Sequence, residues 1–173
     1  MMIYGWFDER NRRELERLIE AYHVRTVIEV GSFLGLSTLW FAERVEHVYC
    51  VDLFSVAESD GSNVGPFLKT LGLPVDFYDV FLSNIAPYQH KITVIRSRST
   101  EAQVPNADLA YIDADHTYAG CKADIAYYSP KVGIISGDDY SVTHPGVMRA
   151  VDETRAIVCA PFWYSISGAA LAA

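Results

Sequence analysis

Three aspartates in the second half of the chain have the residue type and spacing to hold a divalent cation. Asp113 stands in the segment YIDAD, and Asp138 and Asp139 stand together in IISGDDY. Mg²⁺ prefers carboxylate oxygens and usually retains several waters. Three carboxylates brought together would repel one another, and a divalent cation would relieve that repulsion. The alternative for the pair is a turn in which one aspartate caps the segment that follows.

A second group of residues has the spacing of a site for an adenosine-containing ligand. Gly31 and Gly35 lie where a β-branched segment gives way to a helical pattern, so the backbone there can approach a ligand closely. Asp52 follows about 20 residues later, where an acid can accept hydrogen bonds from ribose hydroxyls. The dinucleotide pattern G-x-G-x-x-G is absent, so a pyrophosphate site is not supported.

The elements that must position these residues alternate between strand and helix patterns. Strands are predicted at residues 26–32, 47–54, 91–97, 108–115 and 131–140, and one or two closing strands within 157–166. Helices are predicted in the N-terminal segment, within 35–45, in a stretch ending near residue 87, within 118–128 and within 146–156. This order predicts an α/β fold: a doubly wound, mostly parallel, Rossmann-like sheet with helices on both faces. Ligands of such sheets bind beyond the carboxyl ends of the strands, where all the candidate residues would gather.

Length and composition limit the kind of protein. The 173 residues predict a single domain spanning 1–173, with an N-terminal helical extension at 1–25 and a loop and helix insertion at 55–87. Hydrophobic residues make up 50% of the chain, enough for a folded core. The net charge is −8, and no Lys/Arg cluster is longer than Arg12 and Arg13, so nucleic acid is not an expected partner.

Cysteine usage and hydropathy predict a cytoplasmic protein. The three cysteines are odd in number and widely spaced, which indicates free thiols in a reducing compartment rather than a disulfide framework. The N-terminus lacks the apolar stretch of a secretory signal, and no segment reaches the about 20 apolar residues of a membrane span. No membrane partner is therefore expected.

Five segments, in order, resemble the class I S-adenosylmethionine-dependent methyltransferases. Within that class they are similar to the metal-dependent O-methyltransferases of the catechol, caffeoyl-coenzyme A and macrolide or aminocoumarin sugar type. The segments are VIEVGSFLGLST, VYCVDLF, YIDADHTYAGCKADI, IISGDDY and GVMRAVDE, and they cover residues 26–153. Phe33 stands where the general class often has a third glycine, but E-x-G-x-x-x-G-x-S is similar to the metal-dependent branch. The resemblance implies methyl transfer from S-adenosylmethionine to a hydroxyl of a small molecule.

The resemblance also implies which residues contact the cofactor. Gly31 would line the methionine moiety, Ser37 would bond its carboxylate, and Asp52 would hold the ribose. Arg98 and Ser99 would border the adenine. The full set of expected cofactor-binding residues is Glu29, Gly31, Ser37, Asp52, Arg98, Ser99 and Asp113.

Some of these residues also have ordinary structural explanations. Glu29 would support the glycine loop or the cofactor's amino group, or it would only pair locally. Ser37 is also suited to the first turn of a helix, where it would satisfy backbone amides. We favour the cofactor role for Gly31 and Asp52.

The resemblance also implies that Asp113, Asp138 and Asp139 are ligands of Mg²⁺ or another divalent cation. Such a cation would lower the pKa of the acceptor oxygen and fix its position.

The remaining requirement of methyl transfer to a hydroxyl is a base. His116 stands three residues after Asp113, where the catechol-type relatives carry a lysine, and Asp115 stands where the sugar-type relatives have an acid. Histidine is neutral near pH 7 and can take a proton, so His116 is the predicted base and Asp115 the alternative. His116 would otherwise be a residue at a helix start that bonds only backbone. His144, in the loop after GDDYSVT, could face an acceptor, but we interpret it as a surface residue.

The acceptor is expected to be a sugar, a phenol or another hydroxylated metabolite. Because only a short extension could enclose the site, we expect it to be closed by a second copy in a homo-oligomer or by ordering of the loop at 55–74. Two alternatives belong to other classes: a non-catalytic adenosyl-ligand-binding protein and an NAD-dependent Rossmann oxidoreductase. A non-catalytic binding protein would have no use for the cluster of Asp113, Asp138 and Asp139, and an oxidoreductase would have no role for Asp138 and Asp139. Within the enzyme class, sequences of similar pattern have also been associated with hydroxylation of antibiotic precursors.

Overall fold

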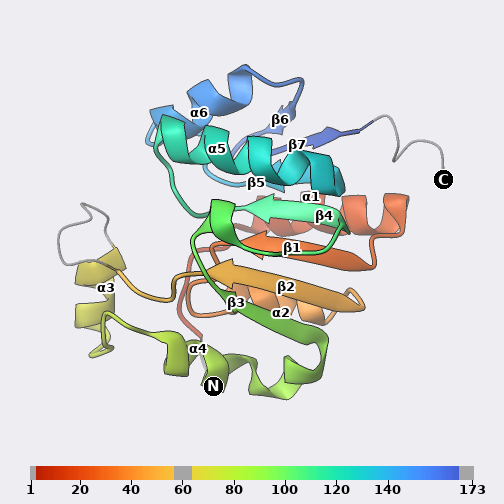
Figure 1. Cartoon of the computed structure of the whole chain (residues 1–173). Helices are drawn as coiled ribbons and strands as arrows, with labels where there is room; N and C mark the ends of the chain where they lie inside the picture. Colours follow the sequence, from red (N-terminus) through yellow and green to blue (C-terminus); the bar gives the residue numbers. More distant parts are fainter. Residues whose placement is uncertain (1–2, 57–63, 168–173) are drawn as a thin grey trace.

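A parallel sheet organises the chain in the computed structural model, which describes residues 3–56 and 64–167 (Figure 1). Its strands are β1 (Thr26–Val30), β2 (His47–Asp52), β3 (Ile92–Arg96), β4 (Ala107–Ile112), β5 (Val132–Gly137), β6 (Ile157–Cys159) and β7 (Phe162–Ile166). Their order is β3-β2-β1-β4-β5-β7-β6. The first five strands pair in parallel, and β7 pairs antiparallel with both β5 and β6. The predicted mostly parallel, doubly wound sheet is confirmed.

Helices cover both faces of this sheet. They are α1 (Glu9–Tyr22), α2 (Leu36–Ala42), α3 (Val64–Thr70), α4 (Tyr78–Ile85), α5 (Tyr118–Tyr128) and α6 (Pro145–Asp152). Successive strand residues face opposite layers, so Val27 joins the core beneath α1, α2 and α4, and Ile28 joins the core beneath α5 and α6. In Figure 1, α5 lies in front of the sheet, while α1 and α2 lie behind it.

The order of the strands reverses between β1 and β4. After β3 forms one edge of the sheet, the chain crosses back and adds β4 on the other side of β1. In register, Val30 is paired with Ile112, and Ile112 is paired with Gly137. The next residues, Gly31, Asp113 and Asp138, therefore follow aligned strand ends, and the reversal makes this edge the expected ligand site.

The boundaries differ from prediction mainly at strand ends. The fourth and fifth strands end at Ile112 and Gly137, because the residues beyond them turn into loops. The insertion predicted at 55–87 contains α3 and α4, and its residues 57–63 lie outside the described part, as do 1–2 and 168–173. In the described residues the three cysteines are free thiols. No helix in that part of the chain is both long and apolar enough to span a membrane.

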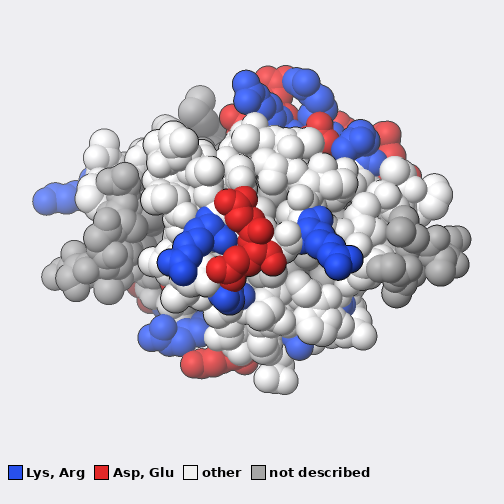
Figure 2. Space-filling model, turned by 90° about the horizontal axis from the view of Figure 1, so that it is seen from above, with Lys and Arg blue, Asp and Glu red and all other residues white. Residues whose placement is uncertain are grey.

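The outer surface of α5 and α6 carries charges of both signs. Lys122 Nζ lies 2.7 Å from Glu153 Oε2, and the Arg149 guanidinium lies 3.9 Å from the centre of the Tyr118 ring. Figure 2, which views the molecule from the α6 side, shows acidic side chains between basic ones rather than one continuous basic surface. These contacts join the two helices, and the loops that precede α5 and α6 carry the candidate histidines.

Candidate active site

The loop after β1 packs directly on the loop after β4 at Gly31. Gly31 has φ +91°, and a Cβ atom there would lie 1.9 Å from the carbonyl oxygen of Asp113. Its N–H donates to the Val51 carbonyl at 2.9 Å, while the Asp113 N–H donates to the Val30 carbonyl at 2.8 Å. Glycine is required here by protein packing and by the left-handed backbone, whatever ligand the loop binds.

Phe33 also has a left-handed backbone, with φ 46°. This conformation explains why glycine would be favoured at the same position. The Phe33 ring packs against Trp6 and Phe77 with ring centres 5.5 and 5.3 Å apart, and these contacts offset the backbone strain. The glycine loop is therefore covered on one side by aromatic side chains from the N-terminal segment and from the loop before α4.

Asp52, at the end of β2, holds the glycine loop in place. Its Oδ2 accepts hydrogen bonds from the N–H groups of Ser32 and Phe33, both at 2.9 Å, and its Oδ1 accepts from the Phe54 N–H at 2.6 Å. Burial raises the pKa of Asp52, and these backbone donors oppose the rise. The residue lies at the edge predicted for the ribose, and Oδ1 keeps capacity for a further donor.

Glu29 supports the glycine loop from inside the protein. Its side chain is fully buried, and it accepts hydrogen bonds from the Ser32 hydroxyl at 2.7 Å and from the Thr38 hydroxyl. Burial raises the pKa of Glu29, while hydrogen bonds from Ser37, Thr38 and Ser32 act in the opposite direction. Ser37 is also buried, so its hydroxyl serves Glu29 in this structure, whereas the resemblance implies the cofactor's carboxylate as its partner.

Helix α5 holds the segment predicted to border adenine. The Tyr128 hydroxyl donates to the Ser99 carbonyl at 2.6 Å, and Asp124 hydrogen-bonds to Ser99. Arg98 is exposed. Asp124 is 1% exposed, and its Oδ2 has no hydrogen-bond partner among the described residues. Burial raises the pKa of Asp124 to about 6, because the charged form is poorly compensated.

Replacing Asp124 with asparagine is expected to stabilise the protein at pH 7 and to remove part of its pH dependence. The folded pKa, about 6, lies above the ordinary value of 3.8, so the folded state binds more protons between these pH values. Stability therefore falls as pH rises through that window, by up to about 3 kcal/mol. Urea unfolding at pH 4 and pH 7 measures the effect. The exposed Glu101→Gln serves as the control, and an Asp124→Asn protein no more stable than wild type at pH 7 would contradict the prediction.

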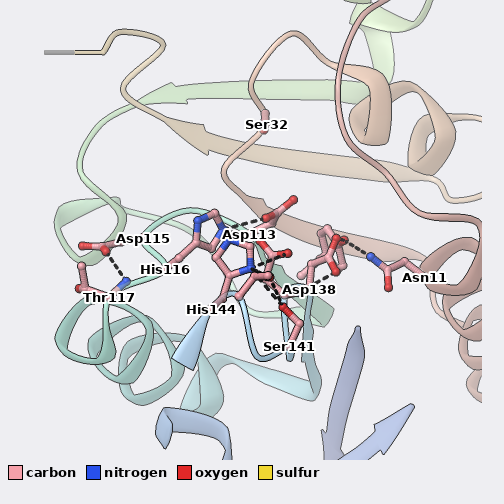
Figure 3. Close-up of polar contacts among 12 residues, drawn as sticks. Asn11, Ser32, Asp113, Asp115, His116, Thr117, Asp138, Ser141 and His144 are labelled. Atoms are coloured by element: carbon pink, nitrogen blue, oxygen red, sulfur yellow. Dashed lines mark hydrogen bonds and ion pairs between the residues drawn. The ribbon is translucent and has the colours of Figure 1, made fainter. Parts of the chain in front are cut away.

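The loops after β4 and β5 bring two histidines and two aspartates together (Figure 3). His116 Nε2 lies 2.9 Å from Asp139 Oδ2 and 3.3 Å from Asp113 Oδ1. His144 Nδ1 lies 3.3 Å from Asp139 Oδ1, and the centres of the two imidazole rings are 4.9 Å apart. His116, Asp113 and Asp139 were predicted to meet at this edge, and the structure brings them together.

The expectation that His116 is neutral near pH 7 is wrong for this arrangement. Burial alone would lower the pKa of His116, but hydrogen bonding to Asp113 and Asp139 raises it to about 10. The same interactions lower the pKa of Asp139 despite its burial. Burial raises the pKa of Asp113, which His116 counteracts. The two carboxylates on either side of His116 thus favour its protonated form.

Asp138 faces away from these histidines. Its Oδ2 lies 3.4 Å from the Tyr111 hydroxyl, which accepts a hydrogen bond from Asn11 Nδ2 at 3.2 Å. Its Oδ1 accepts from the Asp139 N–H at 2.6 Å, which holds Asp139 in its left-handed conformation, φ 61°. Burial and the charge of Asp113 raise the pKa of Asp138 to about 7. In this geometry Asp138 positions Asp139, whereas the sequence led us to expect a metal ligand.

Asp115, the alternative base, is not part of the cluster. Its Oδ1 accepts a hydrogen bond from the Thr117 N–H at 2.8 Å, at the start of α5. A Cβ atom at Gly120 would lie 2.2 Å from this carboxylate, so Gly120 makes room for it. Figure 3 shows Asp115 turned toward Thr117 and away from His116. Asp115 thus stabilises the turn that leads into α5, whose N-cap is Thr117.

Three residues of the site were missed or misplaced by the sequence analysis. His144 was expected at the surface, but it is the second histidine of the cluster. Asn11 and Tyr111 are both fully buried, and they reach Asp138 from α1 and β4. The only sequence signal among them was the position of His144 after a strand end, because a tyrosine inside a strand and an asparagine in an amphipathic helix are both ordinary.

A hollow of about 590 Å³ lies away from this edge, beside the start of β1 and β2. Its charged groups are already engaged: Arg25 pairs with Glu46 at 2.8 Å, and Lys91 Nζ donates to the carbonyls of Ala42 and Val45. None of the candidate residues lines it. We therefore place the active site at the carboxyl edge, on chemistry rather than on the size of a hollow.

Comparisons with known proteins agree with this fold. A family model described as "Methyltransferase domain" matches residues 28–140. An O-methyltransferase from Bacillus cereus in complex with SAH is 16% identical, with a TM-score of 0.62 over 94% of this chain and 83% of that one. The O-methyltransferase TomG from Streptomyces achromogenes, involved in tomaymycin synthesis and in complex with SAM, is 12% identical, with a TM-score of 0.63 over 94% and 82%. A candidate rRNA methylase from Clostridium thermocellum is 12% identical, with a TM-score of 0.54 over 92% and 95%. No curated protein sequence matches the chain.

Proposed function

The chain belongs to the methyltransferase domain family, and on that premise we propose that it transfers a methyl group from S-adenosylmethionine to a hydroxyl of a small molecule, with a divalent cation orienting the acceptor. One observation carries the proposal. The imidazole of His116 lies between the carboxylates of Asp113 and Asp139, at the edge where the strand order reverses. The glycine loop after β1 packs on the loop after β4, which carries His116. Two structures of similar fold were solved with SAM or with its demethylated product SAH, which supports this cofactor.

The proposed cofactor position follows the ends of β1, β2 and β3. The methionine moiety would lie beside Gly31, and the ribose hydroxyls would donate to the free capacity of Asp52 Oδ1. The adenine would lie at Arg98 and Ser99, the segment that α5 holds. Glu29 would act without touching the cofactor, by fixing the hydroxyls around the glycine loop. In this structure Ser37 serves that same role.

Asp113 is proposed to adjoin both the cofactor and the cation. The main chain of Asp113 contacts Gly31, beside the proposed cofactor position, and its side chain reaches His116, beside the proposed cation.

Asp113 and Asp139 place carboxylate oxygens on either side of His116. Their negative charge and oxygen ligands also suit a divalent cation. Asp139 and Asp113 would hold it, and when bound it would lower the pKa of the acceptor hydroxyl and fix its position. Because these carboxylates would then bind the cation, they would raise the pKa of His116 less than they do without it. The Nε2 of His116 can then take the proton from the acceptor hydroxyl. The resulting oxygen attacks the sulfonium methyl, the carbon–sulfur bond breaks, its electron pair stays on sulfur, and SAH leaves.

The proposed acceptor is a small hydroxylated metabolite, such as a phenol or a sugar. The net charge of −8 disfavours a polyanion, although the structures of similar fold include a candidate rRNA methylase. We also propose that residues 1–173 act as one domain, because strands from both ends of the chain belong to one sheet.

Calorimetry with S-adenosylmethionine, SAH and NAD tests the cofactor, and SAH formation with phenols and sugar diols tests the reaction. We expect S-adenosylmethionine and SAH to bind and NAD not to bind. Treatment with EDTA should abolish SAH formation at pH 7 and leave S-adenosylmethionine binding in place, because the cation and cofactor have largely separate ligands. Binding of NAD alone would overturn the proposal, and turnover that is indifferent to EDTA would remove the cation from it. Binding without turnover on any acceptor would instead favour an adenosyl-ligand sensor.

A further inference from the structure

A nitrogen donor lies beside the carboxylate to which the proposed function gives a cation. His144 Nδ1 is 3.3 Å from Asp139 Oδ1. One ligand atom from each of His116, Asp139 and His144 lies within 4.8 Å of the others, and no other group of this kind occurs within residues 3–56 and 64–167. Asp139 is thus flanked by imidazole nitrogens.

The fold builds this arrangement through a close approach of α6. A Cβ atom at Gly146 would lie 2.5 Å from the carbonyl oxygen of His116, so only glycine lets the start of α6 contact that loop. His144 precedes α6, and its N–H donates to the Ser141 carbonyl at 2.9 Å. The hydroxyls of Ser141 and Thr143 each lie 3.3 Å from His144 Nδ1, the same nitrogen that contacts Asp139. Figure 3 shows Ser141 beside the His144 ring.

The donor atoms differ from those that Mg²⁺ prefers. Mg²⁺ favours oxygen ligands in octahedral geometry, whereas imidazole nitrogen suits zinc, iron, nickel and copper. The carboxylate that would have supplied a further oxygen, Asp138, is engaged with Tyr111 and the Asp139 N–H. Three carboxylate ligands were expected, but the structure places a nitrogen of His144 next to Asp139, and Asp138 is turned elsewhere.

We propose that His144 joins Asp113 and Asp139 as a ligand of the cation, and that the site therefore takes a first-row transition-metal dication in preference to Mg²⁺. The cation takes Nδ1 of His144 and a carboxylate oxygen from each aspartate. Its remaining positions are open to water and the acceptor. This inference rests on the proposed function only in placing a cation at this edge of the sheet.

Calorimetric titration of the chelator-treated full chain with Co²⁺ and with Mg²⁺, without cofactor or acceptor, tests the inference. The wild-type protein is expected to bind Co²⁺ at least about 100-fold more tightly than Mg²⁺. His144→Gln should weaken Co²⁺ binding by about 10- to 100-fold and change Mg²⁺ binding by less than about threefold. His90→Gln, at an exposed histidine in the 3₁₀ helix Ala86–Lys91, is the matched control and should change neither. His144 is 35% exposed, so its replacement is not expected to prevent folding.

Two further variants decide which histidine is the ligand. His116→Gln should leave Co²⁺ binding within about threefold, and His144→Asp, which restores an oxygen donor, should narrow the preference for Co²⁺ over Mg²⁺. A loss of Co²⁺ binding in His116→Gln with none in His144→Gln would overturn the assignment, as would equal wild-type affinities for the two ions. Because these titrations contain no S-adenosylmethionine, failure of methyl transfer would leave the metal result standing.

Discussion

Replacing His116 with glutamine is expected to slow methyl transfer by about 100- to 10,000-fold and to leave S-adenosylmethionine affinity within about threefold of wild type. Glutamine keeps a hydrogen-bonding group near Asp113 and Asp139 but cannot take up the acceptor proton. His116 lies after β4, while most of the proposed cofactor contacts follow β1, β2 and β3, so binding and turnover should respond differently. Single-turnover SAH formation and calorimetry measure the two quantities separately.

The matched control for this experiment is His90→Gln, which makes the same change at an exposed histidine away from the proposed site. Asp115→Asn tests the alternative base directly. The Asp115 carboxylate accepts a hydrogen bond from the Thr117 N–H in the turn before α5, so we expect the substitution to cost at most about 1 kcal/mol of stability and to leave turnover in place. If Asp115→Asn abolished turnover while His116→Gln retained it, the base would be Asp115 and our assignment would be wrong.

The pH dependence of turnover should also move with the state of His116. Without a cation its pKa is raised to about 10 by the two aspartates, so most molecules carry the proton at pH 7. The protonated form cannot accept a proton, so a chelator-treated enzyme would regain activity only toward alkaline pH. The rate of SAH formation against pH in EDTA provides that readout alongside the glutamine variant.

Gly31→Ala is expected to destabilise the fold by at least about 3 kcal/mol. The alanine must adopt φ near +91°, and its Cβ would lie 1.9 Å from the Asp113 carbonyl oxygen, which is backbone and cannot rotate away. The left-handed conformation alone costs about 1–3 kcal/mol, and separating the two loops adds to it. Urea unfolding of the variant and the wild type gives the difference in free energy.

The same substitution at Gly65 provides the comparison for Gly31→Ala. Gly65 lies in α3, and no described residue has an atom within 4 Å of the position its Cβ would take. Gly65→Ala should therefore be neutral or stabilise by up to about 1 kcal/mol. Equal stabilities for the two variants would show that the loops after β1 and β4 are not packed as described.

The sequence predicted the mostly parallel sheet, because hydrophobic periodicity and the order of the elements determine it. It also predicted that Asp113 and Asp139 meet His116, since parallel strands end at one edge. It could not show that Asp138 and Asp139 point in different directions. That depends on a left-handed residue and on a tyrosine and an asparagine distant in sequence.

The sequence could not predict the charge state of His116 or the position of His144 either, because both depend on contacts between loops. A histidine's pKa depends on which carboxylates lie within hydrogen-bonding distance, and spacing gives no such distance. His144 reaches Asp139 because Gly146 lets α6 approach the backbone of His116. The effect of one glycine on the approach of two backbones cannot be read from a motif.

The hydrogen bond between Asn11 and Tyr111 joins residues 100 positions apart in the chain. Asn11 precedes the strands in the chain order, and its partner Tyr111 follows the first three of them. Contacts between residues so far apart form late in folding, because a long loop must close first. We therefore expect the turn that aims Asp139 to be completed only when α1 docks on the sheet.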